Sequence, residues 1–451
     1  MRRLSSTLML AGAVGAAVFL AAVPARAEVS SETQFVFNTF SFLVHGFLVM
    51  WMGAGFAMLE SGLVRTKNTA TICLKNVALY SVAGLLYYLI GYNLMYSGVG
   101  DWIGDFTFFY NASEAELALI NADSATPELI APVVENGYSV MSDWFFQMVF
   151  VATAASIVSG TVAERIKVWP FLLFVVVLTG IIYPVQGAWT WGGGWLSKLG
   201  FSDFAGSTIV HSVGGWAALT GAIILGARRG KYGPGGRVTP LPGANLPLAT
   251  LGTFILWFGW FGFNGGSQLA LGSALDAAAI AIVYVNTNLA AAAGLIAAMA
   301  LTQILYKKID LTMTLNGAIA GLVSITAGPD LQNHALAIVV GAIGGAIVVV
   351  AVPLLDRLRI DDVVGAVSAH LFAGIWGTLA VAIFGGGDFV AQIVGIAAIG
   401  GFVVVTSSIL WLIIKHTVGL RVNDEDEEMG LDKAELGMEA YPEFGHGSQT
   451  I

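Results

Sequence analysis

The pattern Asp-x-x-Gly-x-x-x-x-His-x-x-x-Gly occurs twice in this chain and constrains its fold more than any other feature. The first copy contains Asp203 and His211, and the second, 159 residues later, contains Asp362 and His370. Both copies enter an apolar stretch. Each histidine follows its aspartate by eight residues, so a helix rising about 1.5 Å per residue would carry it roughly 12 Å into a membrane span. Titratable groups at that depth are costly and usually mark a substrate or proton path.

The composition is that of a membrane protein with many spans. Hydrophobic residues make up 57% of the chain and charged residues 11%, and 56 of the 451 residues are Gly, which permits close helix packing in lipid. Apolar runs of about 20 residues recur along nearly the whole chain. We therefore predict an all-α membrane protein with eleven transmembrane helices. They lie near 38–62, 76–98, 143–163, 168–187, 205–227, 246–268, 277–305, 312–328, 334–355, 363–385 and 389–416.

The N-terminus has the three parts of a secretory signal. These are Arg2 with Arg3, an apolar core at 8–20, and the small-x-small sequence Ala25-Arg26-Ala27. We expect residues 1–27 to be cleaved as a signal peptide, the alternative being an uncleaved first span. After cleavage the mature N-terminus would begin outside the cell.

Lysine and arginine predict the orientation of the spans. With the N-terminus outside, the odd-numbered gaps between spans face the cytoplasm. These gaps contain all the Lys and Arg residues that lie between spans, except Lys198, which lies in a gap on the opposite side. The positive-inside rule is then met at every crossing. We predict a membrane domain at 28–420 with a periplasmic N-terminus and a cytoplasmic tail at 421–451. The expected location is the inner (plasma) membrane of a bacterium.

The span count explains the repeat. If spans one to five and six to ten are the two copies, each copy has an odd number of crossings, so the copies run in opposite directions. The helix after Asp203 then runs inward from outside, and the helix after Asp362 runs outward from the cytoplasm. Inverted repeats usually place the substrate site where the copies meet, near the midplane. We expect His211 and His370 to meet there.

These polar residues also have plainer interpretations. Asp203 and Asp362 could be helix N-caps, with Asp361, Arg357 and Arg359 forming an ordinary charge cluster beside Asp362, and Asp203 could in addition help to collect a cation outside. A histidine in a span is often a hydrogen-bonded packing residue, which we favour for His45 because it has no partner in the repeat.

Two facing histidines indicate a path more readily than a metal site. Neutral imidazoles that bond to each other leave their outer nitrogens or ring edges along a passage that suits a small neutral molecule. Two His with no Cys and no carboxylate at midplane depth are a poor ligand set for a metal. We expect no metal and no cofactor.

Aromatic residues gather at similar depths in three segments. Most should pack or anchor the helices at the interface, but a cage of rings can also hold a small cation at about 0.5–2 kcal/mol per contact. Ser267 could add an oxygen acceptor that favours a cation bearing N–H groups over a bare alkali ion. The aromatic residues are Trp144, Phe145, Phe146, Phe150, Trp191, Trp257, Trp260, Phe261 and Phe263.

A series of motifs extends from the first span to the tail. They are Gly62-Leu-Val-Arg-Thr-Lys-Asn68, Gly160-Thr-Val-Ala-Glu-Arg165, Trp191-Gly-Gly-Gly, Asp203-Phe-Ala-Gly-Ser-Thr-Ile-Val-His211, Trp260-Phe-Gly-Phe263-Asn264 with Ser267, Asn316-Gly-Ala-Ile-Ala-Gly-Leu-Val, and Asp361-Asp362 with His370. In order and spacing the chain resembles the Amt/Mep/Rh ammonium transporters, in their Amt branch.

The resemblance implies a homotrimer of eleven-span subunits, each with its own pore. Carried over by position, Phe150 and Phe263 would form a stacked gate. Trp191 and Ser267 would form an outer ammonium site, which Asp203 supports from behind. His211 and His370 would be the twin histidines of the pore, with Thr326 and Trp260 along the same path.

The mechanism implied by the resemblance has three steps: NH4+ is recruited, loses its proton near the gate, and passes the histidines as NH3. Net transport would be electrogenic if the proton also crosses. A desolvated cation at the midplane costs several kcal/mol or more, whereas neutral ammonia costs far less. Potassium has no proton to lose, so deprotonation would itself select the substrate. Methylammonium is a further possible substrate.

The chain also departs from the family pattern. Asn316 stands where many relatives have Ser, and Ser368-Ala369-His370-Leu371 replaces the commoner surroundings of the second histidine. Glu60 resembles the version found in part of the Amt branch, and we interpret it as structural.

The tail is acidic at 424–428, and such a run is normally solvated. Similar tails in Amt proteins pack under the pores, and some relatives bind a PII signalling protein there. PII regulation is thus implied here, although Leu436 replaces a frequent His and Met438 is an extra residue.

Two other classes of function stay open at this point. The chain could be a passive channel for neutral gases such as NH3 or CO2, or an ammonium sensor that signals through its tail. The presence of Trp191 and Ser267 argues against the first, and the lack of a long signalling domain argues against the second. No nucleophile constellation, phosphate loop or metal motif supports an enzyme, and no nucleic-acid partner is expected.

Overall fold

The computed structural model describes residues 29–443, and throughout this range the regular structure is helical, without β-strands. The predicted signal peptide, 1–27, lies outside the described residues.

Eleven apolar helical segments cross the body of the molecule, as predicted. Ten are long and apolar enough to span a membrane, and α14 is a shorter apolar helix between two of them. The eleven are α2 (Ser31–Leu63), α3 to α4 (Thr69–Leu86, Tyr87–Gly91, Tyr92–Tyr96), α7 (Val140–Thr161), α8 to α9 (Val168–Val177, Leu178–Ile182, Tyr183–Ala188), η4 with α11 (Ser207–Ser212, Val213–Leu225), α12 (Leu246–Gly266), α13 (Ala274–Tyr306), α14 (Leu311–Ile325), α15 (His334–Arg357), η6 with α16 (Val367–Phe372, Ala373–Phe384) and α17 (Phe389–Thr417).

Many of these helices begin at a side chain that can accept a backbone hydrogen bond. Asn245, Asp310 and Asp388 accept N–H groups from the first turns of α12, α14 and α17. Such caps satisfy N–H donors that have no partner inside the helix. The span boundaries therefore follow from local sequence.

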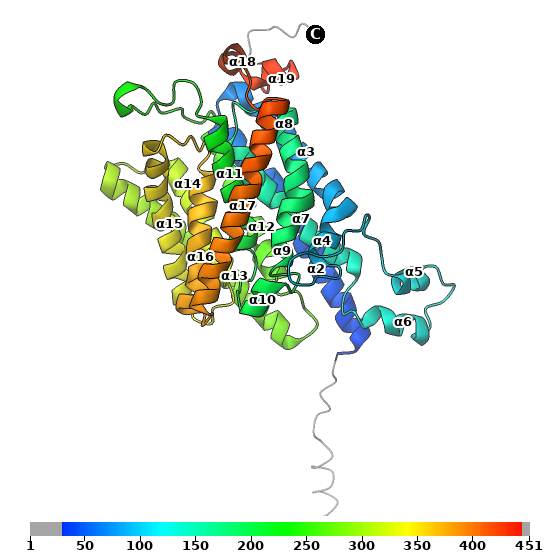
Figure 1. The fold of residues 1–451 in the computed structure, drawn as a ribbon. Coiled ribbons are helices and arrows are strands. Elements are labelled where there is room, and N and C mark those ends of the chain that lie inside the picture. Colours follow the sequence, from blue (N-terminus) through cyan, green and yellow to red (C-terminus); the bar gives the residue numbers. More distant parts are fainter. Residues whose placement is uncertain (1–28, 444–451) are drawn as a thin grey trace, which may run out of the picture.

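Short helices distinguish the two ends of the bundle (Figure 1). The helices α18 (Asp424–Met429) and α19 (Leu431–Leu436) cover one end, here called the tail end. The opposite end, here called the loop end, carries α5 (Glu114–Ile120), α6 (Pro127–Val134) and α10 (Trp195–Leu199).

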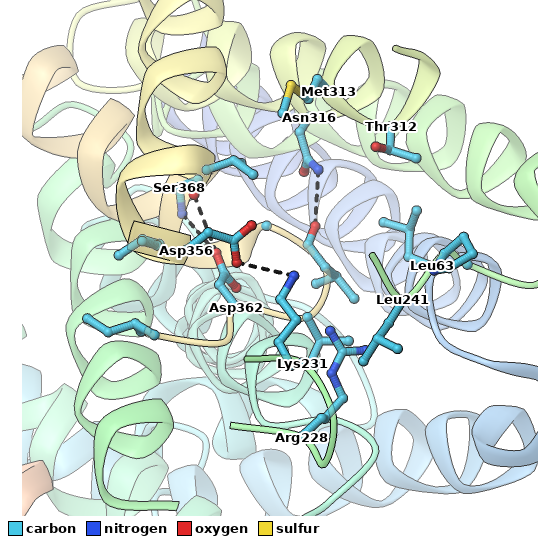
Figure 2. Close-up of a pocket in the computed structure, with 18 residues that line it drawn as sticks. Leu63, Arg228, Lys231, Leu241, Thr312, Met313, Asn316, Asp356, Asp362 and Ser368 are labelled. Carbon is cyan, nitrogen blue, oxygen red and sulfur yellow. Dashed lines mark hydrogen bonds and ion pairs between the residues drawn. The ribbon is translucent and has the colours of Figure 1, made fainter. Parts of the chain in front are cut away.

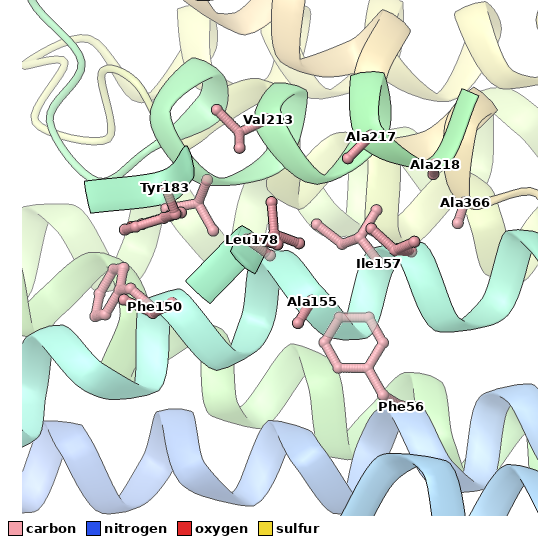
Figure 3. Close-up of a cluster of buried hydrophobic side chains, with 14 of the residues drawn as sticks. Phe56, Phe150, Ala155, Ile157, Leu178, Tyr183, Val213, Ala217, Ala218 and Ala366 are labelled. Carbon is pink, nitrogen blue, oxygen red and sulfur yellow. The ribbon is translucent and has the colours of Figure 1, made fainter. Parts of the chain in front are cut away.

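The main core is one cluster of buried apolar side chains that extends through the bundle. Phe56 of α2, Ile157 of α7, Leu178 of η3 (Leu178–Ile182) and Val213 of α11 lie within it (Figure 3). Small residues such as Ala217 let these helices approach closely.

The two copies of the sequence repeat have the same local structure. Gly206 and Gly365 have φ angles of 112° and 80°, a region that favours glycine. Six-residue π-helical segments, η4 and η6, follow and contain His211 and His370. Each histidine thus lies in a π-helical turn, whereas the expected depth of roughly 12 Å assumed a regular α-helix.

The last glycine of each repeat lies against the other copy. A Cβ on Gly215 would come within 2.7 Å of Leu371 Cβ, and a Cβ on Gly374 would collide with the backbone of Ser207. The copies therefore meet through reciprocal contacts. Since η4 begins near the loop end and η6 near the tail end, the two segments enter the bundle from opposite sides.

Candidate functional site

A cavity of about 360 Å³ opens at the loop end. Trp191, Phe150 and Ser267 lie in its wall, with Tyr92, Tyr96, Tyr138, Asp143, Phe146, Gln147, Phe204 and Leu269. Aromatic faces, hydroxyls and one carboxylate thus surround a space large enough for a hydrated small cation. We refer to it as the outer cavity.

Asp203 holds Trp191 from behind the outer cavity and does not line it. The Trp191 indole N–H donates to the Asp203 carbonyl at 2.9 Å. The buried Asp203 carboxylate accepts four backbone N–H groups, from Gly206 to Ile209, at 2.8–2.9 Å. Burial raises the pKa of Asp203, and these four hydrogen bonds oppose the shift. The Asp203 carboxylate therefore caps the first turn of η4, although Gly206 occupies the N-cap position.

Two phenylalanines close the outer cavity on its inner side. The ring centroids of Phe150 and Phe263 lie 4.1 Å apart, and both side chains are almost fully buried. Phe150 also packs edge-on against Trp191, with centroids 5.9 Å apart. Ser267 caps the same region, its hydroxyl donating to the Phe263 carbonyl at 2.8 Å.

Directly beneath the phenylalanines lie the two histidines of the repeat. The Phe263 and His211 ring centroids are 5.1 Å apart. The Nδ1 atoms of His211 and His370 are 3.3 Å apart and are hydrogen-bonded to each other. One ring must donate and the other accept, so at least one Nδ1 carries a proton. Nε2 of His211 has no partner among the described residues.

Trp260 and Thr326 pack beside this pair. The Trp260 indole stacks on His211 with centroids 4.9 Å apart, and its N–H donates to the Thr326 hydroxyl at 2.8 Å. The hydroxyl in turn donates to the Leu322 carbonyl at 2.7 Å. This chain of bonds fixes the indole plane against His211.

Two further cavities continue from His370 toward the tail end. The first, here called the inner cavity, has a volume of about 10 Å³ and is lined by His370, Glu60 and Phe56. The second, of about 160 Å³, opens at the tail end and is lined by Asp362 and Ser368. Asn316 and Val364 line both cavities, and the Asn316 amide donates to the Val364 carbonyl at 3.0 Å between them (Figure 2).

The partner of Asp361 is remote in sequence rather than a neighbour. Its carboxylate accepts two hydrogen bonds from the Arg228 guanidinium at 2.8 and 2.9 Å, whereas Arg357 and Arg359 are exposed. Burial raises the pKa of Asp361, but Arg165 and Arg228 outweigh it and leave the pKa below its ordinary value. Asp362 instead caps η6 through the Ser368 N–H and accepts from Thr161, while burial raises its pKa.

His45 is held by hydrogen bonds on both ring nitrogens. Nδ1 contacts Ser41 and Nε2 lies 2.9 Å from the Tyr284 hydroxyl. This arrangement fits the interpretation of His45 as a packing residue.

Several residues of these cavities had no recognisable signal in the sequence. Tyr92, which bonds to Asp143, lies in the outer cavity, and Phe56 packs near His370 with centroids 6.2 Å apart. Asp143 alone had a usable signal, because it is a carboxylate in the first turn of an apolar span.

The acidic tail is folded against the tail end. The Asp432 carboxylate accepts the N–H groups of Ala70 and Thr71 at 2.9 and 2.8 Å, and so caps α3. Glu427 pairs with Arg421 at 2.6 Å. The tail is therefore folded onto the protein, and within the acidic run at 424–428 Glu427 is buried while Asp424, Glu425 and Glu428 stay exposed.

Comparisons with known proteins agree with this architecture. The model of the Ammonium Transporter Family matches residues 40–441. Ammonium transporter Amt2 of Archaeoglobus fulgidus is 41% identical over 433 residues, covering 89% of this chain and 87% of its own length. A putative ammonium transporter of Synechocystis is 42% identical and covers 94% of both chains.

Solved structures give the same result. A protein titled "Sensor Amt Protein" superposes with a TM-score of 0.79 at 34% identity, covering 89% of this chain and 99% of its own. Candida albicans Mep2 superposes with a TM-score of 0.74 at 28% identity, covering 92% of both chains. With a family match over most of its length and relatives above 40% identity, the chain belongs to the ammonium transporter family.

Proposed function

We propose that this protein binds NH4+ in the outer cavity, removes its proton at the phenylalanine pair and conducts NH3 past the twin histidines, with net electrogenic uptake. Residues 28–420 would form the transport domain, following a cleaved signal peptide at 1–27. The loop end would be periplasmic and the tail end cytoplasmic.

The outer cavity has the chemistry that recruits a small N–H cation. The ring of Trp191 supplies a π face, and the Ser267 hydroxyl supplies an oxygen that can accept an N–H bond. The Asp143 carboxylate adds negative charge to the same wall. In our proposal ammonium is held at Trp191 and Ser267 before the phenylalanines part.

Passage beyond the two phenylalanines is energetically costly for a cation. Phe150 and Phe263 are stacked and buried, and moving a charge past them would cost several kcal/mol or more. Ammonia carries no charge and can exchange hydrogen bonds with His211 and His370. Potassium cannot lose a proton and is therefore excluded.

One observation carries the proposal. The gate-like pair Phe150 and Phe263 is followed directly by His211 and His370, whose Nδ1 atoms lie 3.3 Å apart inside an apolar bundle. Nothing in this arrangement would hold a bare cation, but a line of imidazoles can relay a hydrogen-bonding neutral molecule or a proton.

Currents from proteoliposomes on a solid-supported membrane test the proposal. Ammonium pulses should give a current in the wild type that potassium pulses do not give, and His211→Ala should change the current or its selectivity. His416→Ala is the matched control, because His416 is exposed on α17 away from the pore. A current that is the same for His211→Ala and wild type would contradict a path through the histidines.

A passive gas channel is the outcome to distinguish. If ammonium gives no current in the wild type but an ammonia gradient raises the internal pH, the protein conducts neutral gas. Silence in both measurements would refute transport under those conditions.

Ammonium sensing is a second candidate, supported by two observations. The tail is folded onto α3 through Asp432, and a structural neighbour is titled a sensor. In this case ammonium binding would change the exposure of the tail even when transport is blocked. Hydrogen exchange of residues 424–441 with and without ammonium tests it.

We further propose a homotrimer in a bacterial inner membrane, with PII binding at the tail. The tail would offer PII a folded surface, because the Lys67 side chain and the Arg229 backbone N–H hold it at Glu427. Native mass spectrometry in detergent would give the subunit number, and titration with a PII protein would test the partner.

A further inference from the structure

Glu60 is a buried carboxylate with one oxygen unused. It lies on α2 and is 1% exposed. Its Oε2 accepts a hydrogen bond from the Ser159 hydroxyl at 2.8 Å, whereas Oε1 has no partner among the described residues. Buried polar atoms that only pack are normally satisfied. Oε1 is therefore open to a small ligand.

A buried ammonium group lies close to this carboxylate. The Lys75 Nζ donates to the Ser159 carbonyl at 3.0 Å and lies 4.8 Å from the centre of the Phe171 ring. Ser159 thus bridges the two charged side chains. Lys75 offsets part of the cost of a charge at Glu60 without occupying its Oε1.

Glu60 also lines the inner cavity, directly after His370. Glu60 and His370 are the titratable residues in the wall of this cavity, which the Asn316 contact to Val364 separates from the tail-end cavity. Its volume of about 10 Å³ suits one water-sized molecule. Ammonia is of that size.

We propose that Glu60 is the proton-exchange group of the inner cavity, holding one ammonia or water molecule on Oε1 and passing a proton between the histidine pair and the tail end. This inference rests on the proposed function and deepens it.

Protons are conserved in the proposed series of transfers. The proton that ammonium loses at the phenylalanine pair bonds to His211 and passes through the Nδ1 contact, which makes His370 an imidazolium. His370 then gives a proton to one water molecule in the inner cavity, and that water gives a proton to Oε1. The imidazole is then neutral again, and the carboxylate has become a carboxylic acid. An ammonia molecule that then enters the cavity takes this proton and leaves as ammonium. Glu60 returns to the carboxylate, and net charge has moved with the ammonia.

Glu60→Gln is the direct test because it keeps the shape and the Ser159 contact but cannot carry the proton. We expect its ammonium current to fall about tenfold or more, while ammonia-driven alkalinisation inside the liposomes persists. Glu116→Gln is the matched control, since Glu116 is a buried glutamate that caps α5 at the loop end.

The outcomes separate the two proposals. If folded Glu60→Gln gives the same ammonium current as the wild type, the role of Glu60 is refuted, but the proposal of ammonium transport is not. No current in the wild type refutes electrogenic transport itself. A parallel loss of alkalinisation and current would also overturn the inference, because it would make Glu60 a packing residue.

Infrared spectroscopy of the wild-type protein tests the role of Glu60 even if Glu60→Gln does not fold. Wild-type protein labelled with carbon-13 glutamate should show an ammonium-induced band of a protonated glutamate carboxyl. The band should persist in Glu116→Gln. Its absence from the wild type would overturn the proposal.

Discussion

At the residue scale, the site depends on polar groups that are buried and paired. The Trp260 indole is held flat against His211 because its N–H bonds to Thr326, whose hydroxyl is anchored to a helix carbonyl. The same scale explains Asp203, whose carboxylate accepts four N–H groups and fixes the turn behind Trp191. A threonine hydroxyl thus positions the ring of Trp260, and the backbone carbonyl of Asp203 positions the ring of Trp191.

Thr326→Val should destabilise the protein by about 1–3 kcal/mol, because it leaves the buried Trp260 N–H without a partner. Thermal unfolding in detergent measures the effect as a lower midpoint. Thr326→Ser keeps the hydroxyl and is the control. Equal midpoints for the Val and Ser variants would show that the hydrogen bond contributes nothing.

Asp361 should make the tail end sensitive to acid. Its folded pKa lies below that of an unfolded Asp, about 3.9, so the stability it contributes is complete above that value and is lost as the pH falls through the folded pKa. Asp361→Asn should therefore unfold at a lower temperature than wild type at pH 7. The difference should shrink below about pH 4.

Unfolding midpoints between pH 7 and pH 3 measure this effect. Asp330→Asn is the control because Asp330 is exposed. A difference between Asp361→Asn and wild type that stays constant with pH would refute the assigned cause.

At the element scale, the two repeats build the histidine pair by the same device. A glycine with positive φ precedes each π-helical segment, and a second glycine lets the other copy approach. The π-helical turns set the direction of His211 and His370, because they rotate the side chains relative to a regular α-helix.

Gly215→Ala should reduce transport by displacing the segment that carries His370. The added Cβ would lie 2.7 Å from Leu371 Cβ, next to His370, and overpacking of this kind costs about 1–3 kcal/mol. Ammonium current per folded protein measures the effect. Gly53→Ala is the control, because no atom lies within 4 Å of its added Cβ. Comparable currents for both variants would contradict the predicted displacement.

At the scale of the whole molecule, the C-terminal tail packs against an early part of the chain. Asp432 caps α3, and Lys67 donates to the Glu427 carbonyl, so residues more than 350 positions apart share one surface. The tail is therefore in contact with the membrane-spanning bundle through η1 (Thr66–Asn68) and α3.

Asp432→Ala should release the tail, because removal of a cap of this kind costs about 0.5–2 kcal/mol. Hydrogen exchange at 424–441 should then become faster, while the spans keep their protection. Glu425→Ala is the control, since Glu425 is exposed in the same tail. Unchanged exchange in Asp432→Ala would show that other contacts hold the tail.

The sequence by itself determined the helical class, the eleven spans and the repeat, because hydropathy, caps and residue spacing are local properties. It also identified Phe150, Phe263, His211 and His370 as candidates, through motif and depth. The folding of the tail against the bundle was less predictable, since a run of charges such as 424–428 is normally solvated.

Only the tertiary structure decided which side chains meet. The 3.3 Å approach of the histidines depends on two π-helical turns and on the crossing of two distant segments. Arg228, rather than the neighbouring Arg357, pairs with Asp361, and Glu60, which has one unused oxygen, lines the inner cavity with His370. Such contacts depend on how the helices pack against one another, and residue spacing along one helix does not specify that packing.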